Sequence, residues 1–259
     1  MEFINSFQSE WLKRRRSLTS WLVLVGAFFT PLIILTSRIK DHAVLSKLYN
    51  ADDFWRRNWN QSWESMEVFL LPVGIILATA LFAQIEYKNN TWKQLHTTPQ
   101  RFTTIFFAKF LVILIMLAQV FALFNLGVYL SAVIPSVVFS DVPYPSAQIP
   151  FREFWNGNVN FFVNCLPVVA LQMLLSLQFK NFLVPVGAGF GIWFLGVGLL
   201  SWKYSFLFPY IHGAISFMTV SGHFAGRFVP VKIEYLALVY FAVFLAAGWF
   251  FYVTKSDKG

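Results

Sequence analysis

Residues 82–110, FAQIEYKNNTWKQLHTTPQRFTTIFFAKF, form a polar island between two long apolar runs. The island holds a single carboxylate, Glu86, four basic residues and a proline, Pro99, which stops a helix. The flanking runs, about 67–85 and 105–131, have the roughly 20 apolar residues that a membrane-crossing helix needs. The stretch therefore predicts a polar loop between two membrane spans. A loop that only joined the spans could be shorter and less polar, so we expect this one to meet a protein at the cytoplasmic side.

The composition places the chain among membrane proteins. Of its 259 residues, 57% are hydrophobic and only 12% are charged, whereas soluble domains average about 25% charged residues. This deficit excludes an ordinary globular enzyme. The net charge of +8 would suggest a nucleic-acid partner for a soluble protein. Basic residues of membrane proteins gather at cytoplasmic loop ends, so we expect no nucleic-acid partner here.

Continuous apolar runs, without the alternation of a membrane barrel, indicate helices. We predict an all-α integral membrane protein in which residues 1–259 form a single transmembrane domain. The six predicted transmembrane helices cover about 19–37, 67–85, 105–131, 159–179, 182–201 and 234–254.

The basic residues also predict the orientation. With a cytoplasmic N-terminus, the inner segments carry a net charge of +7 and the outer segments +1. Both termini are therefore expected to be cytoplasmic, in a multi-pass protein. Residues 13–16, KRRR, resemble the start of a signal peptide, but the apolar run after them is too long and lacks a cleavage site. We expect a retained first span.

Residues 2–17 precede that span and predict an amphipathic interfacial helix. Phe3, Ile4, Phe7 and Trp11 fall on one arc at helical spacing, and the basic end can reach lipid phosphates of the bilayer. This helix could serve only as a topology anchor, or it could also form a functional surface; the sequence leaves both interpretations open. The predicted membrane-interface anchor consists of Trp11, Lys13, Arg14, Arg15 and Arg16.

Three outer segments are expected between the spans. Residues 38–66 are rich in tryptophan and charge, which suits the headgroup zone or, alternatively, a lid. Residues 132–158 contain four prolines and predict an irregular connection. Residues 206–219 are apolar but too short to cross, with Pro209 and Gly213 as breaks, and predict a short re-entrant or interfacial segment before the last span.

No catalytic constellation is visible in the sequence. The phosphate-binding motif G-x-x-x-x-G-K-[ST], H-E-x-x-H and G-x-S-x-G are all missing. Cys165 stands alone and the histidines lack ligand spacing, so we predict no catalytic residue, metal site or cofactor. Gly187 and Gly191 predict close packing of a helix on a neighbour. Glu67 and Glu234 stand at outer span ends, which predicts no ion-coupling carboxylate at mid-membrane depth.

Several polar side chains fall inside the predicted spans. They either line a translocation path or form hydrogen bonds between helices, which is the commoner case and contributes about 1 kcal/mol or less each. The candidates are Gln119, Asn125, Asn164, Gln172 and Ser176.

Together these features resemble the membrane subunit of an ABC-2 type transporter, particularly the small six-span permeases of lantibiotic immunity and bacitracin resistance. The likeness is carried by the N-terminal helix that ends in residues 13–16, by the loop from Glu86 to Arg101, by residues 172–179 before a glycine-rich fifth span, and by Pro209-Tyr210 before the last span.

The resemblance implies that the loop is a coupling helix that docks into a groove of a separate ABC ATPase subunit. It also implies a bacterial plasma membrane, a second permease subunit as a homodimer or heterodimer, and efflux of, or immunity to, an antibiotic peptide. The implied coupling residues are Glu86, Lys88, Thr91, Trp92, Leu95, Thr98, Pro99 and Arg101.

A second function remains open at this point. A membrane scaffold or sensor that transports nothing could use the same loop to recruit a different cytoplasmic partner. An intramembrane enzyme is a third possibility, but it lacks any catalytic constellation.

Overall fold

The computed structural model describes residues 2–15, 17–88, 100–222 and 232–254, apart from the side chains of Glu86 and Lys88. These residues form helices and no strand. The first half of the chain contains α1 (Glu2–Arg15), α2 (Leu18–Lys40), α3 (His42–Tyr49), α4 (Phe54–Ser65), the π-helical turn η1 (Met66–Leu70) and α5 (Leu71–Lys88). The second half contains α7 (Phe102–Val138), α8 (Phe151–Gln178), α9 (Leu183–Gly198), the 3₁₀ turns η2 (Ser205–Leu207) and η3 (Pro209–Ile211), α10 (His212–Val220) and α11 (Ile233–Thr254).

The predicted class, an all-α membrane protein, is confirmed. Within the described residues, five helices are long and apolar enough to cross a membrane: Leu18–Lys40, Phe54–Ile85, Phe102–Val138, Phe151–Gln178 and Ile233–Thr254. The predicted fifth span corresponds to α9, which has only 16 residues. At 1.5 Å per residue it is about 24 Å long, shorter than the roughly 30 Å hydrocarbon core.

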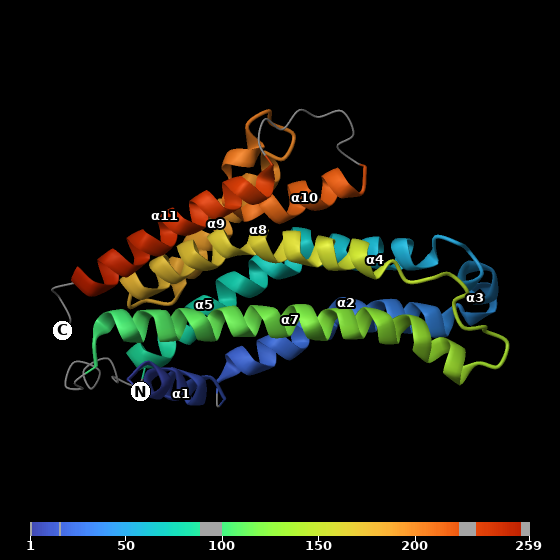
Figure 1. Cartoon of the computed structure of the whole chain (residues 1–259), viewed down its shortest axis with the longest axis horizontal. Coiled ribbons are helices and arrows are strands. Elements are labelled where there is room, and N and C mark those ends of the chain that lie inside the picture. The colour runs from blue at the N-terminus through green and yellow to red at the C-terminus, as the bar shows by residue number, and fades with distance from the viewer. Residues whose placement is uncertain (1, 16, 89–99, 223–231, 255–259) are drawn as a thin grey trace.

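The helices lie lengthwise in an elongated bundle (Figure 1). The start of α1, the end of α5, the start of α7 and the end of α11 lie at one end of the bundle. The helix α3 and the connection from α7 to α8 lie at the opposite end. The helix α1 and the two helix ends that flank the α5–α7 connection thus lie at the same end of the bundle.

The expectation of an outer loop over residues 38–66 is wrong. These residues form the end of α2 together with α3 and α4, and α4 continues through η1 into α5. Trp55, Trp59 and Trp63 are buried inside the protein. They are buried because they pack against aromatic rings of other helices. Trp59, for example, stacks on Phe161 of α8, with ring centroids 5.4 Å apart.

The expectation of an irregular connection over residues 132–158 is also too broad. The helix α7 continues through Pro135 to Val138, and α8 begins directly after Pro150, so only residues 139–150 lie outside these two helices. A proline fits before the first turn of a helix because the first N–H groups there have no intrahelical partner. Three of the four prolines therefore border or interrupt the connection, while Pro135 lies in the last turn of α7.

The short segment before the last helix agrees in part with the prediction. Pro209 begins the 3₁₀ turn η3, as expected of a helix break, but Gly213 lies inside α10 and does not break it. A side chain at Gly213 would clash with the carboxylate oxygen Oε2 of Glu67. The glycine is therefore explained by this close approach between α10 and η1.

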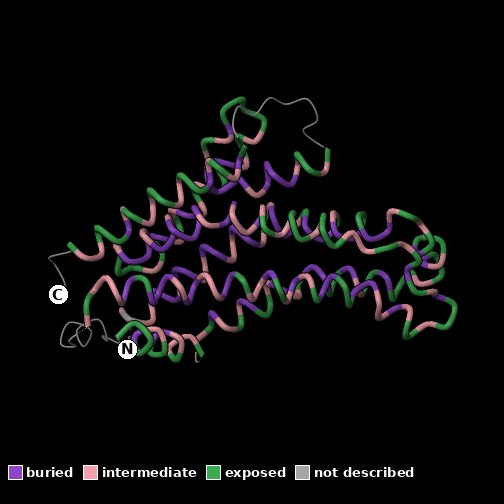
Figure 2. The backbone as a smooth tube through the Cα atoms, in the orientation of Figure 1, coloured by how far each residue is buried: buried purple, intermediate pink, exposed green. Residues whose placement is uncertain are grey.

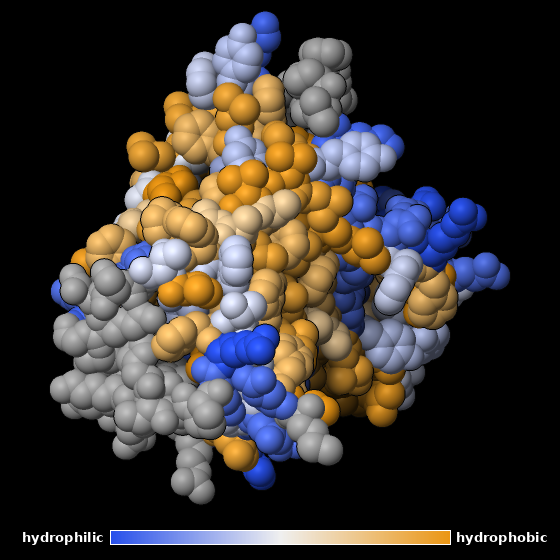
Figure 3. All heavy atoms as spheres, turned by 60° about the vertical axis from the view of Figure 1, so that its left-hand side comes forward, coloured by the Kyte–Doolittle hydropathy of each residue, from blue (hydrophilic) through white to orange (hydrophobic). Residues whose placement is uncertain are grey.

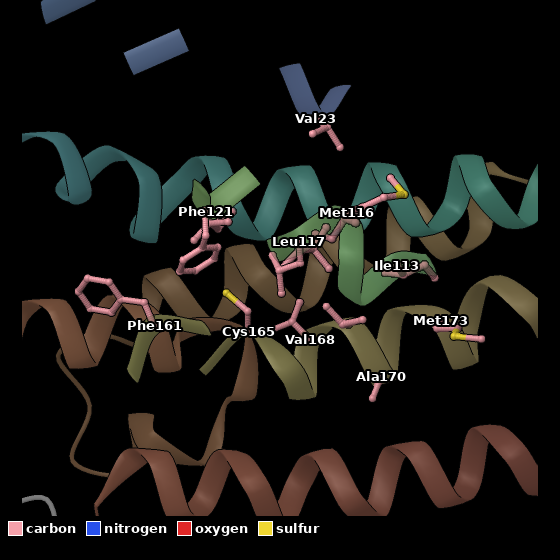
Figure 4. Packing of buried hydrophobic residues seen from close by; sticks show 14 of the residues in the cluster. Val23, Ile113, Met116, Leu117, Phe121, Phe161, Cys165, Val168, Ala170 and Met173 are labelled. Atoms are coloured by element: carbon pink, nitrogen blue, oxygen red, sulfur yellow. The ribbon is translucent and has the colours of Figure 1, made fainter. Parts of the chain in front are cut away.

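The core of the bundle lies between α2, α5, α7 and α8. Figure 4 shows Met116 and Leu117 of α7 beside Cys165 and Val168 of α8, all within one buried cluster. By contrast, α11 is exposed along much of its length (Figure 2). Its exposed side chains are largely apolar, and Figure 3 shows a continuous apolar area on the face drawn there. Apolar surface of this extent fits a lipid environment or a second membrane subunit.

Candidate functional site

A buried ion pair joins the N-terminal helix to the third long helix. Lys109 Nζ of α7 lies 2.8 Å from Glu10 Oε2 of α1, and both side chains are at most 2% exposed. Lys13 Nζ donates to the other oxygen, Glu10 Oε1, at 2.6 Å. Lys109 also lies over the ring of Phe82, 5.3 Å from its centroid. The pair of Glu10 and Lys109 thus connects α1 to α7. The contact of Lys109 with Phe82 adds the end of α5.

This contact was not predicted from the sequence. The fully buried residues of α1 are Ser6 and Glu10. Of the predicted apolar arc, Phe7 and Trp11 are partly buried against the core, whereas Phe3 and Ile4 are exposed. The signal that could have found it is Lys109 itself, since a lysine inside an apolar run needs a partner. The exposed apolar residues still fit an interfacial helix, because that face is free to meet lipid.

The predicted membrane-interface anchor is divided between two environments. Phe7 stacks on Trp11 with ring centroids 5.9 Å apart, and the Arg14 guanidinium lies 4.3 Å from the centroid of the Trp11 ring. Burial lowers the pKa of the Arg14 guanidinium. Arg15 is exposed, and Arg16 lies outside the described residues.

Both stems of the α5–α7 connection are fixed to neighbouring helices. On the α5 side, the Tyr87 hydroxyl donates to the Leu177 carbonyl of α8 at 2.9 Å. On the α7 side, the Arg101 backbone N–H donates to Glu2 Oε1 of α1 at 3.0 Å. The two stems thus tie α5 to α8 and α7 to α1 at this end of the bundle.

The predicted coupling residues are only partly placed by the structure. Arg101 directly precedes α7, and Glu86 and Lys88 lie in the last turn of α5, where their side chains are outside the described part. Thr91, Trp92, Leu95, Thr98 and Pro99 also fall outside the described residues.

Three of the five candidate polar residues lie on one face of α8 and are buried: Asn164, Gln172 and Ser176. Gln172 Nε2 donates to the Pro185 carbonyl of α9 at 2.8 Å, and Gln172 Oε1 accepts from the Tyr210 hydroxyl at 2.7 Å. Gln172 therefore links α8 both to α9 and to η3.

The other two candidates lie on α7, apart from this group. Asn125 and Asn158 of α8 exchange amide hydrogen bonds, with N–O distances of 2.6 and 3.3 Å. Gln119 is only partly buried, and its Oε1 has no hydrogen-bond partner among the described residues. No hydrogen bond among the described residues joins these two candidates to the three on α8.

Beside the Asn125–Asn158 pair lies a cavity of about 600 Å³ between α4, α7 and α8, which we call the aromatic cavity. Its volume is in the range of small-molecule sites, roughly 300–1,000 Å³. Its aromatic lining residues are Trp55, Trp59, Phe121, Tyr129, Phe151, Phe154, Trp155 and Phe162. Asn58, Asn125 and Asn158 add polar groups, and none of the described lining residues is charged. Such a cavity suits an uncharged apolar group.

Residues 6–196 match the family model described as ABC-2 family transporter protein. This range begins in α1 and ends in α9, and it includes both stems of the connection and the aromatic cavity. The chain belongs to the ABC-2 transporter family. The ABC-2 resemblance inferred from the sequence is thereby confirmed. No curated protein matches the chain.

Membership of the ABC-2 family makes this chain a membrane component of a transporter and not itself a catalyst. The family also implies an ATPase partner. Within the described residues, no group of three or more histidine, cysteine or acidic side chains could hold a metal ion.

Proposed function

We propose that this ABC-2 chain is the permease subunit of an exporter in which a separate ATPase docks on residues 86–101 and drives transport. The ATPase must be separate in this proposal because the sequence contains no phosphate-binding loop. The observation that supports docking at this loop is that both stems of the connection are hydrogen-bonded to neighbouring helices. The hydrogen bonds from Tyr87 to α8 and from Arg101 to α1 join four helices at this end.

Docking there would move packed helices as units. A force on the connection reaches α5 and α7 directly, and it reaches α1 through the buried pair of Glu10 and Lys109. Closely packed interiors transmit a displacement as rigid-body motion rather than absorbing it locally. The connection is thus mechanically coupled to the helices that border the aromatic cavity.

The lining of the aromatic cavity indicates which class of molecule the permease transports. We propose that the apolar part of an antibiotic peptide or of a lipid-like molecule occupies it during efflux or immunity. Aromatic walls suit such a group, and the lack of charged side chains in the described lining disfavours a charged one. The proposal places the chain in a bacterial plasma membrane with both termini cytoplasmic, where it pairs with a second permease subunit.

The test is a mild-detergent pull-down of the tagged full chain from its native membranes. A P-loop ATPase is expected to co-purify, and Glu86→Arg or Arg101→Glu should reduce its recovery at least tenfold. The control is Arg57→Glu, an exposed charge on α4 near the other end of the bundle, which should keep the partner. Recovery of the chain alone, or with a protein lacking nucleotide-binding motifs, would contradict the proposal and favour the scaffold or sensor function.

A further inference from the structure

A buried carboxyl group on η1 has no cationic partner in the described structure. The described residues include two buried acidic side chains, Glu10 and Glu67, each 2% exposed. Glu10 has two lysines beside it, whereas no ion pair is formed by Glu67 and its Oε1 has no hydrogen-bond partner among the described residues. The expectation that Glu67 stands at the outer end of a span is wrong, because the helix long and apolar enough to cross runs from Phe54 to Ile85 and Glu67 lies near its middle. Burial of its carboxyl group was not expected either.

The carboxyl group lies at an irregular point of the helix. Glu67 belongs to η1, the single π-helical turn between α4 and α5. Such turns interrupt an α-helix at some cost and recur at functional sites. The facing residue on α10 is Gly213, where any side chain would meet Glu67 Oε2. The backbone on both sides is therefore shaped around this one side chain.

Asn164 of α8 completes the site. It is 1% exposed, and neither its Nδ2 nor its Oδ1 has a partner among the described residues. Asn164 and Glu67 line the same small cavity, together with Cys165, Tyr210 and Gly213. The cavity has a volume of about 10 Å³, which is about the minimum for one water molecule. Two unsatisfied buried polar side chains in one such cavity are unusual, because buried polar groups are nearly always paired.

The surroundings of Glu67 supply no positive charge. The described residues that line the cavity from η1, α5, α8, η3 and α10 include no lysine, arginine or histidine. The titratable groups among them are the Cys165 thiol and the Tyr210 hydroxyl, which already donates to Gln172. His212, the residue before Gly213, does not line the cavity; its Nε2 donates to the Phe206 carbonyl at 2.8 Å, which leaves the neutral ring an acceptor at Nδ1, and Nδ1 has no hydrogen-bond partner among the described residues. An ionised carboxylate in this place would be desolvated without compensation.

We propose that the Glu67–Asn164 cavity is a proton-binding site, in which Glu67 is a neutral carboxylic acid that shares its proton with Asn164 through one water molecule. The acid O–H donates and the acid C=O accepts, while an asparagine amide offers one acceptor and two donors. The pairing satisfies Glu67 and Asn164 together. Release of the proton leaves a carboxylate against α10, which favours displacement of the segment from Pro209 to Val220.

Proton binding here needs no ATPase, so the purified full chain is sufficient for the test. Infrared difference spectra at neutral pH compare wild type with Glu67→Gln. We expect the carbonyl band of a protonated carboxylic acid in wild type and its loss in the variant. The matched control is Glu64→Gln, an exposed acid one turn earlier on α4, which should remove only carboxylate bands. A wild-type protein whose Glu67 contributes carboxylate bands at neutral pH would overturn the proposal.

Two further measurements do not depend on the folding of Glu67→Gln. Asn164→Val should shift the carboxylic acid band, because the acid loses its hydrogen-bond partner. The unfolding temperature of wild type should fall as the pH rises from about 4.3, the ordinary pKa of a glutamate in an unfolded chain, because above that pH the folded protein holds a proton that the unfolded chain has released. An unshifted band in Asn164→Val, or an unfolding temperature of wild type that does not fall over this pH range, would contradict the proposed site.

Discussion

At the scale of single residues, Glu10 neutralises positive charge for two helices at once. A buried ion pair adds little net stability over apolar packing, but removing one member is costly because the other stays buried. Lys109→Met leaves Glu10 paired with Lys13, whereas Glu10→Gln removes the carboxylate from both lysines. We expect Glu10→Gln to lower the unfolding free energy by about 3 kcal/mol, and Lys109→Met to lower it less. The measurement is chemical unfolding of the purified protein in detergent.

The control for this comparison is Arg15→Gln, at an exposed position of the same helix, which should change the unfolding free energy by no more than about 0.5 kcal/mol. If Glu10→Gln is no more destabilising than Arg15→Gln, the carboxylate does not fix α1 to α7.

The residue scale also marks the limit of prediction from sequence. The lone lysine in the third apolar run signals that a partner exists, but no local pattern pairs it with a residue 99 positions away. The same holds for Glu67, whose burial results from α8, η3 and α10 packing around it. Asn164 and Gln172 were found as polar residues inside a span, because polarity in an apolar run is visible locally. The partners of Gln172, Tyr210 and Pro185, depend on the tertiary fold.

At the scale of elements, the apolar helices followed from hydropathy, whereas α4 did not. Its sequence FWRRNWNQSWES is polar on average, which suggested a loop. The signal was the spacing of Trp55, Trp59 and Trp63, four residues apart, which places three indoles on one helical face. The average composition of α4 is polar and does not reveal the face that the three tryptophans form. The α5–α7 connection remains a prediction, because most of its proposed coupling residues lie outside the described structure.

The packing of α4 on α8 gives an element-scale prediction. A Cβ at Gly157 would lie 2.7 Å from Cη2 of Trp59, so Gly157→Ala must displace the indole ring from α8. We expect a loss of about 1–3 kcal/mol in unfolding free energy, as in other overpacked cores, together with a changed tryptophan emission spectrum. The control is Gly26→Ala on α2, where nothing lies within 4 Å of an added Cβ. It should be neutral or stabilising, because alanine favours a helix over glycine. Equal effects of the two substitutions would contradict the close contact.

At the scale of the whole molecule, the two ends of the bundle should face opposite sides of the membrane. The chain has one cysteine, Cys165, which is buried, so Cys165→Ala gives a background for single-cysteine labelling. Val44→Cys on α3 and Tyr204→Cys before η2 replace exposed residues and should react with a membrane-impermeant maleimide in intact cells. Arg15→Cys on α1 should react only after the membrane is opened, because basic residues gather on the cytoplasmic side.

Labelling of Val44→Cys and Tyr204→Cys from opposite sides would mean that the chain crosses the membrane an odd number of times between them. Among the described residues, four helices lie between these positions, and three of them, Phe54–Ile85, α7 and α8, are long and apolar enough to cross. That result would therefore identify the shorter helix α9 as the element that fails to cross.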